Sequence, residues 1–261
     1  MTEPIENYIE VSGYKCRVWS KGKGNRIGFL PGFGGLPKWI PFLDVLAEDY
    51  EVVVPSIPGF PGGLGHNNYD NHLEWLLAIH DLLQESKLLD STTIVGSGPG
   101  ASLCADIAAL WPSLIKKLCL ISPWGIYADN EPMADPWAQR AHEVSELMCD
   151  NPELWDNLKS EPNGKKSVEW PIEQSRALEA SARIFWPLGN TGLEKRLCRV
   201  CCPVLLLRGV NDKVIPKSYM KTFSNNISGE TTTKEINKAG HLAELDQPEI
   251  VAKEIISFIS L

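Results

Sequence analysis

The sequence predicts an α/β fold whose central sheet is mostly parallel. Short apolar segments of strand length alternate with segments that have helical spacing, and this rhythm is typical of a parallel sheet with helices on both faces. Several Gly-rich loops directly follow these strands. Because the carboxyl ends of parallel strands meet at one edge of a sheet, we expect the loops to converge there and form a ligand site. A chain of 261 residues, 43% of them apolar, suits one such domain with an insertion.

The first third of the chain predicts a hairpin, two buried strands and two helices. Apolar and polar residues alternate on both sides of residues 12–13 (Ser-Gly), a pattern typical of an antiparallel hairpin at a sheet edge. We expect buried strands at residues 27–30 and 50–55, with a helix over 39–47 between them. An amphipathic helix is expected over 69–86, and its spacing predicts one apolar face made of Leu73, Leu76, Leu77, His80 and Leu83.

The rest of the chain continues the rhythm but is interrupted once. The expected strands are 92–95, 117–122, 204–208 and 231–236, and the expected helices are 102–110 and 248–259. The rhythm stops over residues 127–195, a segment that contains four of the nine tryptophans, Trp137, Trp155, Trp170 and Trp186. We therefore predict a core made of residues 1–126 and 196–261, with a helical cap over 127–195 covering the strand ends.

Charge and composition exclude several classes of function. The net charge of −8 argues against a nucleic-acid surface, which needs a basic footprint, and it gives no reason to expect an anionic membrane. No segment approaches the roughly 18 apolar residues of a membrane span, and the acidic start does not resemble a signal peptide. The seven cysteines are expected to be reduced, in a cytoplasmic protein. Cys198, Cys201 and Cys202 lack the further ligands of a zinc site, so no metal and no cofactor is expected.

The central feature of the sequence is residues 94–101, Ile-Val-Gly-Ser-Gly-Pro-Gly-Ala. An apolar strand end, a Gly-rich turn and an apolar helix follow one another, which is typical of a nucleophile elbow with the pattern G-x-S-x-G. Here Gly98 takes the nucleophile position and carries no hydroxyl. The next residue, Pro99, has no backbone N–H to offer to an oxyanion. Ser97 is one residue out of register, with its side chain expected to point away from the elbow tip.

Four further segments resemble the α/β-hydrolase superfamily, in the order that the family has them. Residues 30–34 (Leu-Pro-Gly-Phe-Gly) resemble the oxyanion loop, and residues 57–60 (Ile-Pro-Gly-Phe) resemble the loop after the next strand. Residues 208–216 resemble the segment of the catalytic acid, and residues 239–249 resemble the segment of the base. The resemblance implies the α/β-hydrolase fold, with a mostly parallel eight-stranded sheet flanked by helices. The inserted segment is similar to the capped subgroup, which acts on small organic substrates.

The resemblance also implies roles for individual residues. His241 takes the position of the base and Asp212 that of the acid, with Gly98 as a vacant nucleophile position. The N–H of Phe33 would donate to an oxyanion. The other residues expected to lie around the oxyanion and the substrate are Pro99, Ser97, Trp124 and Trp186.

Three hypotheses for function remain open at this point. The first is an enzyme that acts on a small apolar ester, lactone or ketone with Asp212 and His241 as a base dyad and no covalent intermediate. The second is a non-catalytic protein that binds a ligand or partner on the hydrolase scaffold. The third is an inactivated variant of a serine hydrolase in which glycine replaces the serine at position 98. In all three, the covalent serine route is excluded for this chain. The expected partner is a small apolar carbonyl compound, and the oligomeric state is left open.

Overall fold

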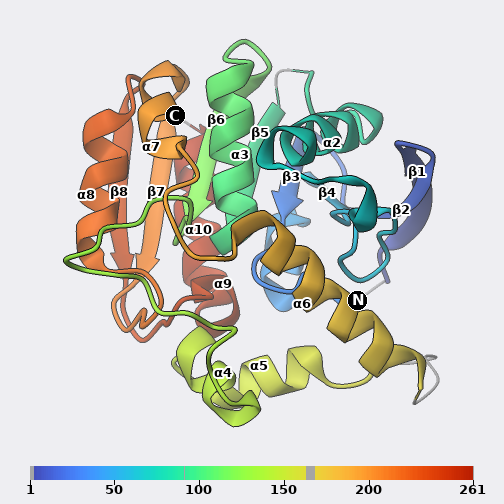
Figure 1. The fold of residues 1–261 in the computed structure, drawn as a ribbon. Helices are drawn as coiled ribbons and strands as arrows, with labels where there is room; N and C mark the ends of the chain where they lie inside the picture. The colour runs from blue at the N-terminus through green and yellow to red at the C-terminus, as the bar shows by residue number, and fades with distance from the viewer. Residues whose placement is uncertain (1–2, 91, 163–167, 261) are drawn as a thin grey trace.

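The computed structural model describes residues 3–90, 92–162 and 168–260. It contains one eight-stranded sheet with helices on both faces, which confirms the predicted fold class (Figure 1). The strands are β1 Ile5–Val11, β2 Tyr14–Lys21, β3 Arg26–Leu30, β4 Glu51–Pro55, β5 Thr92–Ser97, β6 Ile115–Ile121, β7 Val204–Gly209 and β8 Thr231–Ile236. The α-helices are α1 Pro41–Leu46, α2 His72–Glu85, α3 Gly98–Leu110, α4 Ala141–Met148, α5 Pro152–Lys159, α6 Glu169–Phe185, α7 Leu193–Arg196, α8 Lys217–Asn226, α9 Ala243–Asp246 and α10 Pro248–Ser260. Two short 3₁₀ helices are η1 His66–Asn68 and η2 Leu197–Arg199.

The sheet has the order β1-β2-β4-β3-β5-β6-β7-β8. β2 pairs antiparallel with both β1 and β4, and all the other neighbouring strands pair parallel. The expected edge hairpin is therefore present as β1 and β2. β5 lies in the middle of the sheet, between β3 and β6, and it delivers the chain to the elbow.

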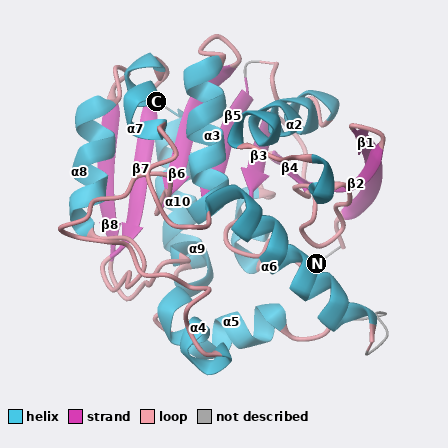
Figure 2. Ribbon diagram, in the orientation of Figure 1, coloured by secondary structure: helices cyan, strands magenta, loops and turns pink. Residues whose placement is uncertain are grey.

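Alternate residues of each central strand supply two separate apolar cores, one on each face of the sheet. On β5, Ile94 packs into the core shared with α2 and α3, whereas its neighbour Val95 packs into the core shared with α1 and α10. Figure 2 shows α2, α3 and α8 in front of the sheet and α10 behind it. Because both faces are covered, the strands are apolar on both sides, as a parallel sheet requires.

Two of the predicted helices differ from the observed ones. α2 is shorter than predicted, and its buried face is Trp75, Leu76, Ala78, Ile79, Leu82 and Leu83. Leu73 and Leu77 are 60% and 46% exposed, so their assignment to the apolar face was wrong. The buried face instead runs through Trp75, Ile79 and Leu82, at the helical spacing of three and four residues. α3 begins at Gly98 and not at residue 102, because the elbow itself forms its first turn.

The segment after β6 holds the helices α4, α5 and α6, which we call the inserted helices. They lie beyond the carboxyl ends of the strands, at the bottom of Figure 1. The last residue of α9 contacts the turn between α4 and α5: Asp246 accepts hydrogen bonds from the backbone N–H groups of Asp150 and Asn151, at 2.8 and 3.0 Å. The division into a core and a cap over 127–195 stays a prediction, and residues 163–167 of that cap lie outside the described residues.

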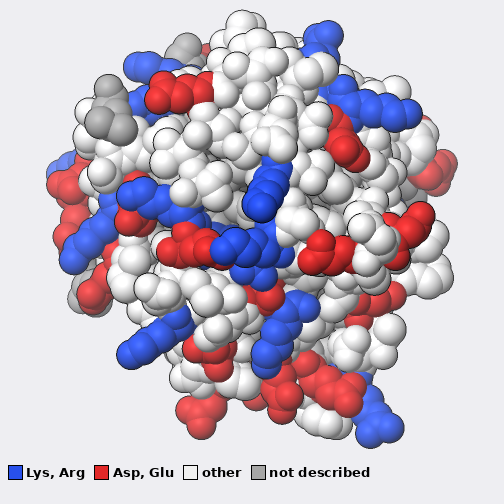
Figure 3. All heavy atoms as spheres, turned by 90° about the vertical axis from the view of Figure 1, so that its left-hand side faces the viewer, with Lys and Arg blue, Asp and Glu red and all other residues white. Residues whose placement is uncertain are grey.

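The surface carries charges of both signs. On the face that includes α8 and β8, Lys and Arg side chains alternate with Asp and Glu (Figure 3). Lys217 pairs with Glu235 and Lys234 with Glu254, each at 2.6 Å. Among the helices of the described residues, none is long and apolar enough to cross a membrane.

Candidate active site

The elbow between β5 and α3 is built on close contacts that need glycine. A Cβ on Gly96 would lie 2.6 Å from the Ala101 Cα, and one on Gly100 would lie 2.5 Å from the Leu30 carbonyl oxygen. Gly98 itself has φ of +48°, the left-handed conformation that a nucleophile at this turn would have to adopt. The backbone of the elbow is therefore complete, and the side chain that would act there is missing.

Opposite Gly98 lies a buried pair of acid and base. His241 Nδ1 is 3.1 Å from Asp212 Oδ2, and both side chains are fully buried. The other carboxylate oxygen, Asp212 Oδ1, accepts hydrogen bonds from the N–H groups of Val214 and Ile215 at 2.8 and 3.0 Å. These backbone bonds fix the carboxylate so that Oδ2 faces the imidazole.

The loop around Asp212 is held from within by Arg208 at the end of β7. Its guanidinium donates to the carbonyl oxygens of Gly209, Asp212 and Ile215 at 3.0, 2.9 and 3.1 Å. Burial alone would raise the pKa of the Asp212 carboxyl, but the interaction with His241 and the hydrogen bond from the Ile215 N–H outweigh burial and hold this pKa below its usual value. Asp212 is therefore an anion suited to orient His241.

The second ring nitrogen of His241, Nε2, already has a hydrogen-bond partner within the chain. The indole Nε1–H of Trp124 donates to His241 Nε2 at 2.9 Å, in the position where a serine hydroxyl would donate. An N–H can donate only to an unprotonated nitrogen, so His241 carries its proton on Nδ1, facing Asp212. A Cβ on Gly98 would lie 3.5 Å from Trp124 Nε1 and 3.1 Å from His241 Nε2. The absence of a side chain at position 98 thus leaves room for the indole.

Trp124 is fixed by a cluster of aromatic rings. It stacks on Phe33 with ring centroids 5.9 Å apart and meets Trp137 and Phe185 edge-on at 5.8 and 5.7 Å. Phe33 stacks in turn on Trp155 at 6.2 Å. These rings come from the loop after β3, the loop after β6 and the inserted helices. They fill the space above the dyad, where an enzyme of this architecture would admit a substrate.

A pocket of about 370 Å³ lies on the other side of this aromatic layer, between the inserted helices and the loop after β3. Its lining residues are Phe33, Gly34, Pro136, Trp137, Gln139, Val144, Trp155, Lys159, Gln174 and Leu178. Gly98, Asp212 and His241 are not among them. A void of about 10 Å³ beside Leu242 and Glu244, close to His241 in the sequence, has room for about one water. Phe33 and Trp124 therefore separate the pocket from the dyad.

The structure brings some of the sequence-predicted site residues together but not all of them. Phe33, Trp124, Asp212 and His241 lie around Gly98, and Pro99 is buried in the first turn of α3. Ser97, the last residue of β5, is fully buried next to the elbow. The prediction that Trp186 lies around the substrate was wrong. Its side chain is 55% exposed, and its indole donates to Asp135 Oδ2 at 3.3 Å. Its neighbour Phe185 packs on Trp124 because the end of α6 turns that side chain inward.

Sequence reasoning missed two buried ionisable groups near the site. Burial raises the pKa of Glu244 to about 7, although Ser97 and His241 oppose the rise, and Oε2 has no hydrogen-bond partner among the described residues. Burial also lowers the pKa of Lys159 to about 7. Glu244 stands in the segment that carries His241, which was a usable signal, whereas nothing in the local sequence marks Lys159. Within the described residues, no group of three His, Cys, Asp or Glu side chains is placed to hold a metal.

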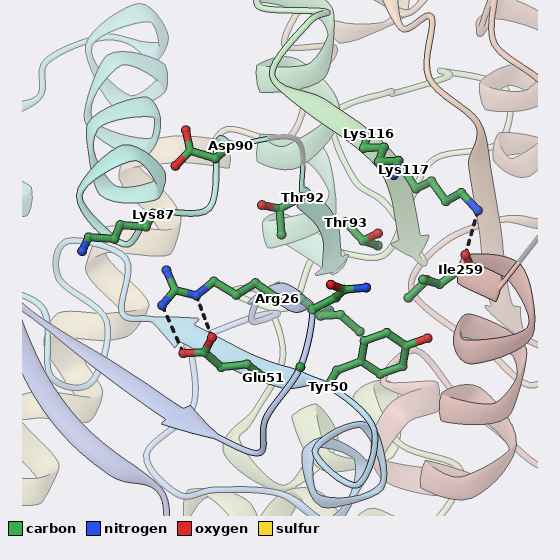
Figure 4. A pocket seen from close by; sticks show the side chains of 13 residues that line it. Arg26, Tyr50, Glu51, Lys87, Asp90, Thr92, Thr93, Lys116, Lys117 and Ile259 are labelled. Carbon is green, nitrogen blue, oxygen red and sulfur yellow. Dashed lines mark hydrogen bonds and ion pairs between the residues drawn. The ribbon is translucent and has the colours of Figure 1, made fainter.

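A second hollow, of about 700 Å³, lies at the opposite edge of the sheet, where β3, β4 and β5 begin. Three of its charged groups have partners: Arg26 donates to both oxygens of Glu51 at 2.8 and 3.2 Å, and Lys117 donates to the Ile259 carbonyl at 2.8 Å (Figure 4). Neither the loop of Phe33 nor the elbow at Gly98 lines this hollow. The hollow is therefore a surface depression remote from the elbow.

Comparison with known proteins agrees with the order of these loops. A family model described as "Alpha/beta hydrolase family" matches residues 29–254. The chain belongs to the alpha/beta hydrolase family. This hydrolase-family chain is 22% identical to a 2-hydroxy-6-oxo-6-(2'-aminophenyl)hexa-2,4-dienoic acid hydrolase of Metapseudomonas resinovorans, over 98% of this chain and 91% of that protein. It is 24% identical to a karrikin insensitive 2 receptor of Petunia hybrida, over 85% of each.

Solved structures show the same fold in other members of the family. One is a 2-hydroxy-6-oxo-6-phenylhexa-2,4-dienoate hydrolase from Rhodococcus sp. strain RHA1, which matches with a TM-score of 0.78 at 16% identity over all of both chains. At this level of identity the likeness establishes the alpha/beta hydrolase fold. Some relatives of this chain are hydrolases by name and one is a receptor, so the substrate or ligand of this chain has to be argued from its own residues.

Restoring a serine is not expected to restore activity. We expect Gly98→Ser to lower the free energy of unfolding by about 1–3 kcal/mol, because φ is +48° and the added Cβ crowds His241 and Trp124. Hydrolysis of nitrophenyl esters should stay at background, since Pro99 offers no oxyanion donor. The measurements are urea unfolding and ester turnover, with Gly189→Ser, at an open position, as the control. Turnover of ordinary enzymatic size in Gly98→Ser would identify this chain as an inactivated serine hydrolase.

Removing the indole donor should destabilise the site. Trp124→Phe leaves His241 Nε2 buried without a donor, so we expect a loss of about 1–3 kcal/mol in the free energy of unfolding. A double-mutant cycle with His241→Ala isolates the bond between the two residues. Trp137→Phe is the matched control, because its indole donates to the Leu178 carbonyl at the surface. A coupling energy near zero between positions 124 and 241 would contradict the assignment.

Glu244 should make stability depend on pH. Its folded pKa, about 7, lies above the unfolded value of 4.5, so the unfolded chain releases this proton first and the protein loses stability as pH rises from 4.5 to 7. We expect the free energy of unfolding of Glu244→Gln to equal that of the parent near pH 4 and to be roughly 3 kcal/mol higher above pH 7. Urea unfolding across this range tests it, with the exposed Glu249→Gln as control. The prediction would be contradicted if the difference in unfolding free energy between Glu244→Gln and the parent were the same at pH 4 and pH 8.

Proposed function

We propose that this protein binds a small apolar carbonyl compound between the inserted helices and the core, and that it does not carry out the covalent chemistry of its family. The inserted helices serve as the cap that closes the binding pocket. The observation that carries the proposal is the Trp124–His241 hydrogen bond at 2.9 Å. It occupies the base nitrogen with a donor from the chain itself, inside a layer of stacked rings.

The pocket supports the binding role. A volume of about 370 Å³ suits a small organic molecule, and its walls include the rings of Phe33, Trp137 and Trp155. The Gln174 amide lines the pocket and is a candidate to orient a carbonyl oxygen, whereas the Gln139 amide already donates to the Asp135 carbonyl at 2.9 Å. One relative of this chain is named a receptor, which is consistent with ligand recognition on this scaffold.

A second candidate function is non-covalent catalysis by the Asp212–His241 dyad. The observation in its favour is that the acid and base keep their geometry, with Asp212 held as an anion. A positioned base of this kind contributes about 10²–10⁴ in rate, enough for an activated lactone or ketone. It requires the Trp124 indole to leave His241 Nε2 when the substrate enters.

Ligand binding should be visible without turnover. We expect small aromatic ketones and lactones to quench the fluorescence of the pocket tryptophans and to raise the melting temperature. Trp137→Ala should weaken binding about tenfold or more, because it removes one wall of the pocket. His241→Gln, which keeps an acceptor for the Trp124 N–H, should leave affinity within about threefold.

The same panel separates the two candidates. Slow turnover that disappears in His241→Gln and increases in Trp124→Phe would support dyad catalysis and overturn the binding role. Absence of binding by every member of the panel, together with absence of turnover, would reject both.

A further inference from the structure

The pocket contains a buried amine, that of Lys159, which plays no part in the Asp212–His241 pair. This residue ends α5 and is 9% exposed. Its Nζ donates to the carbonyl oxygens of Gly35 and Phe33 at 2.7 and 3.2 Å and lies 4.7 Å from the centre of the Trp155 ring. An ammonium has three donors, so two are bound to the loop after β3 and one is left for a group in the pocket.

Lys159 has no carboxylate partner. Among the described residues, no Asp or Glu lies within ion-pair distance of its Nζ, and it is the one charged side chain among the ten that line the pocket. The residues outside the description, 1–2, 91, 163–167 and 261, include no Asp or Glu either. A buried ammonium without a counter-charge is costly, and a ligand that brings the opposite charge would be favoured there.

We propose that the ligand is a small monocarboxylic acid with an aromatic or branched apolar body, and that its carboxylate binds Lys159 Nζ. The body would pack between Trp137, Trp155 and Leu178, with the Gln174 amide beside the carboxylate. This inference rests on the proposed binding function and names its ligand class: the carbonyl compound is an acid. Charge-assisted hydrogen bonds to carboxylates are about twice as strong as neutral ones, so the acid is preferred over a neutral analogue.

The protonation of Lys159 supports the same conclusion. Burial lowers the pKa of this amine to about 7, and the nearby Cys149 raises it slightly. The facing groups are the two loop carbonyls and the Cys149 thiol, whose own pKa burial raises, so the thiol stays neutral through this range. The amine is charged below pH 7 and loses its proton above it. A bound carboxylate favours the charged form and is released as the amine deprotonates.

The test compares an acid with its neutral analogue of the same shape. Binding of 3-phenylpropanoate and 3-phenylpropanamide is measured by calorimetry at pH 6 on the full chain and on Lys159→Met. We expect the acid to bind the parent at least tenfold more tightly than the amide. Lys159→Met should lower the affinity for the acid tenfold or more and change the affinity for the amide by no more than about threefold. In the parent, the affinity for the acid should fall at least tenfold between pH 6.5 and 9, whereas that for the amide should not change.

Each outcome has a distinct meaning. Equal binding of acid and amide by the parent, or an acid affinity that neither pH nor Lys159→Met alters, would overturn the carboxylate site and leave the binding function standing. Binding of neither compound, nor of any ketone or lactone, would reject the binding function itself. If Lys159→Met fails to fold, the pH series on the parent decides, with Lys159→Arg expected to bind the acid at both pH values.

Discussion

The hydrogen bond from the Trp124 indole to His241 Nε2 determines how the rest of the site is arranged. It gives the buried imidazole the donor that it would otherwise lack, and it fixes the proton on Nδ1 toward Asp212. The glycine at residue 98 also favours this bond, because a Cβ there would crowd His241 Nε2 at 3.1 Å and touch the indole nitrogen at 3.5 Å. The glycine, the indole and the imidazole therefore form one unit, in which a change at any of the three disturbs the other two.

This unit explains why the acid and base persist without a nucleophile. Asp212 orients His241, and Arg208 holds the loop that carries Asp212. The Asp212–His241 hydrogen bond thus connects the loops that follow the neighbouring strands β7 and β8. Breaking the pair would leave a buried carboxylate and a buried imidazole unsatisfied, at a cost of several kcal/mol. The dyad is thus stabilising in its present geometry, whether or not it performs chemistry.

Much of this arrangement could be predicted from the sequence, because it depends on local patterns. The elbow, the loop of Phe33, Asp212 and His241 follow strand ends with characteristic glycines, and the parallel sheet brings such loops to one edge. The indole bond could not be predicted, since it joins residues 117 positions apart through a side-chain rotamer. The orientation of Trp186 could not be predicted either. Phe185 and Trp186 are neighbours at the end of α6, and the spacing of the tryptophans does not determine which of the two side chains contacts Trp124.

The burial of Lys159 could not be predicted from the sequence for a different reason. A lysine at the end of an amphipathic helix is normally solvated, and here it is buried because the loop after β3 presents two carbonyl oxygens to it. One of those carbonyls belongs to Phe33, the ring that separates the pocket from the dyad. A charge that binds Lys159 would therefore act on the loop beside the dyad, through the carbonyl oxygens of Phe33 and Gly35. On one side of Phe33 the reacting group of the family is missing, and on the other side an unpaired cation faces an apolar pocket. This asymmetry favours recognition over bond cleavage.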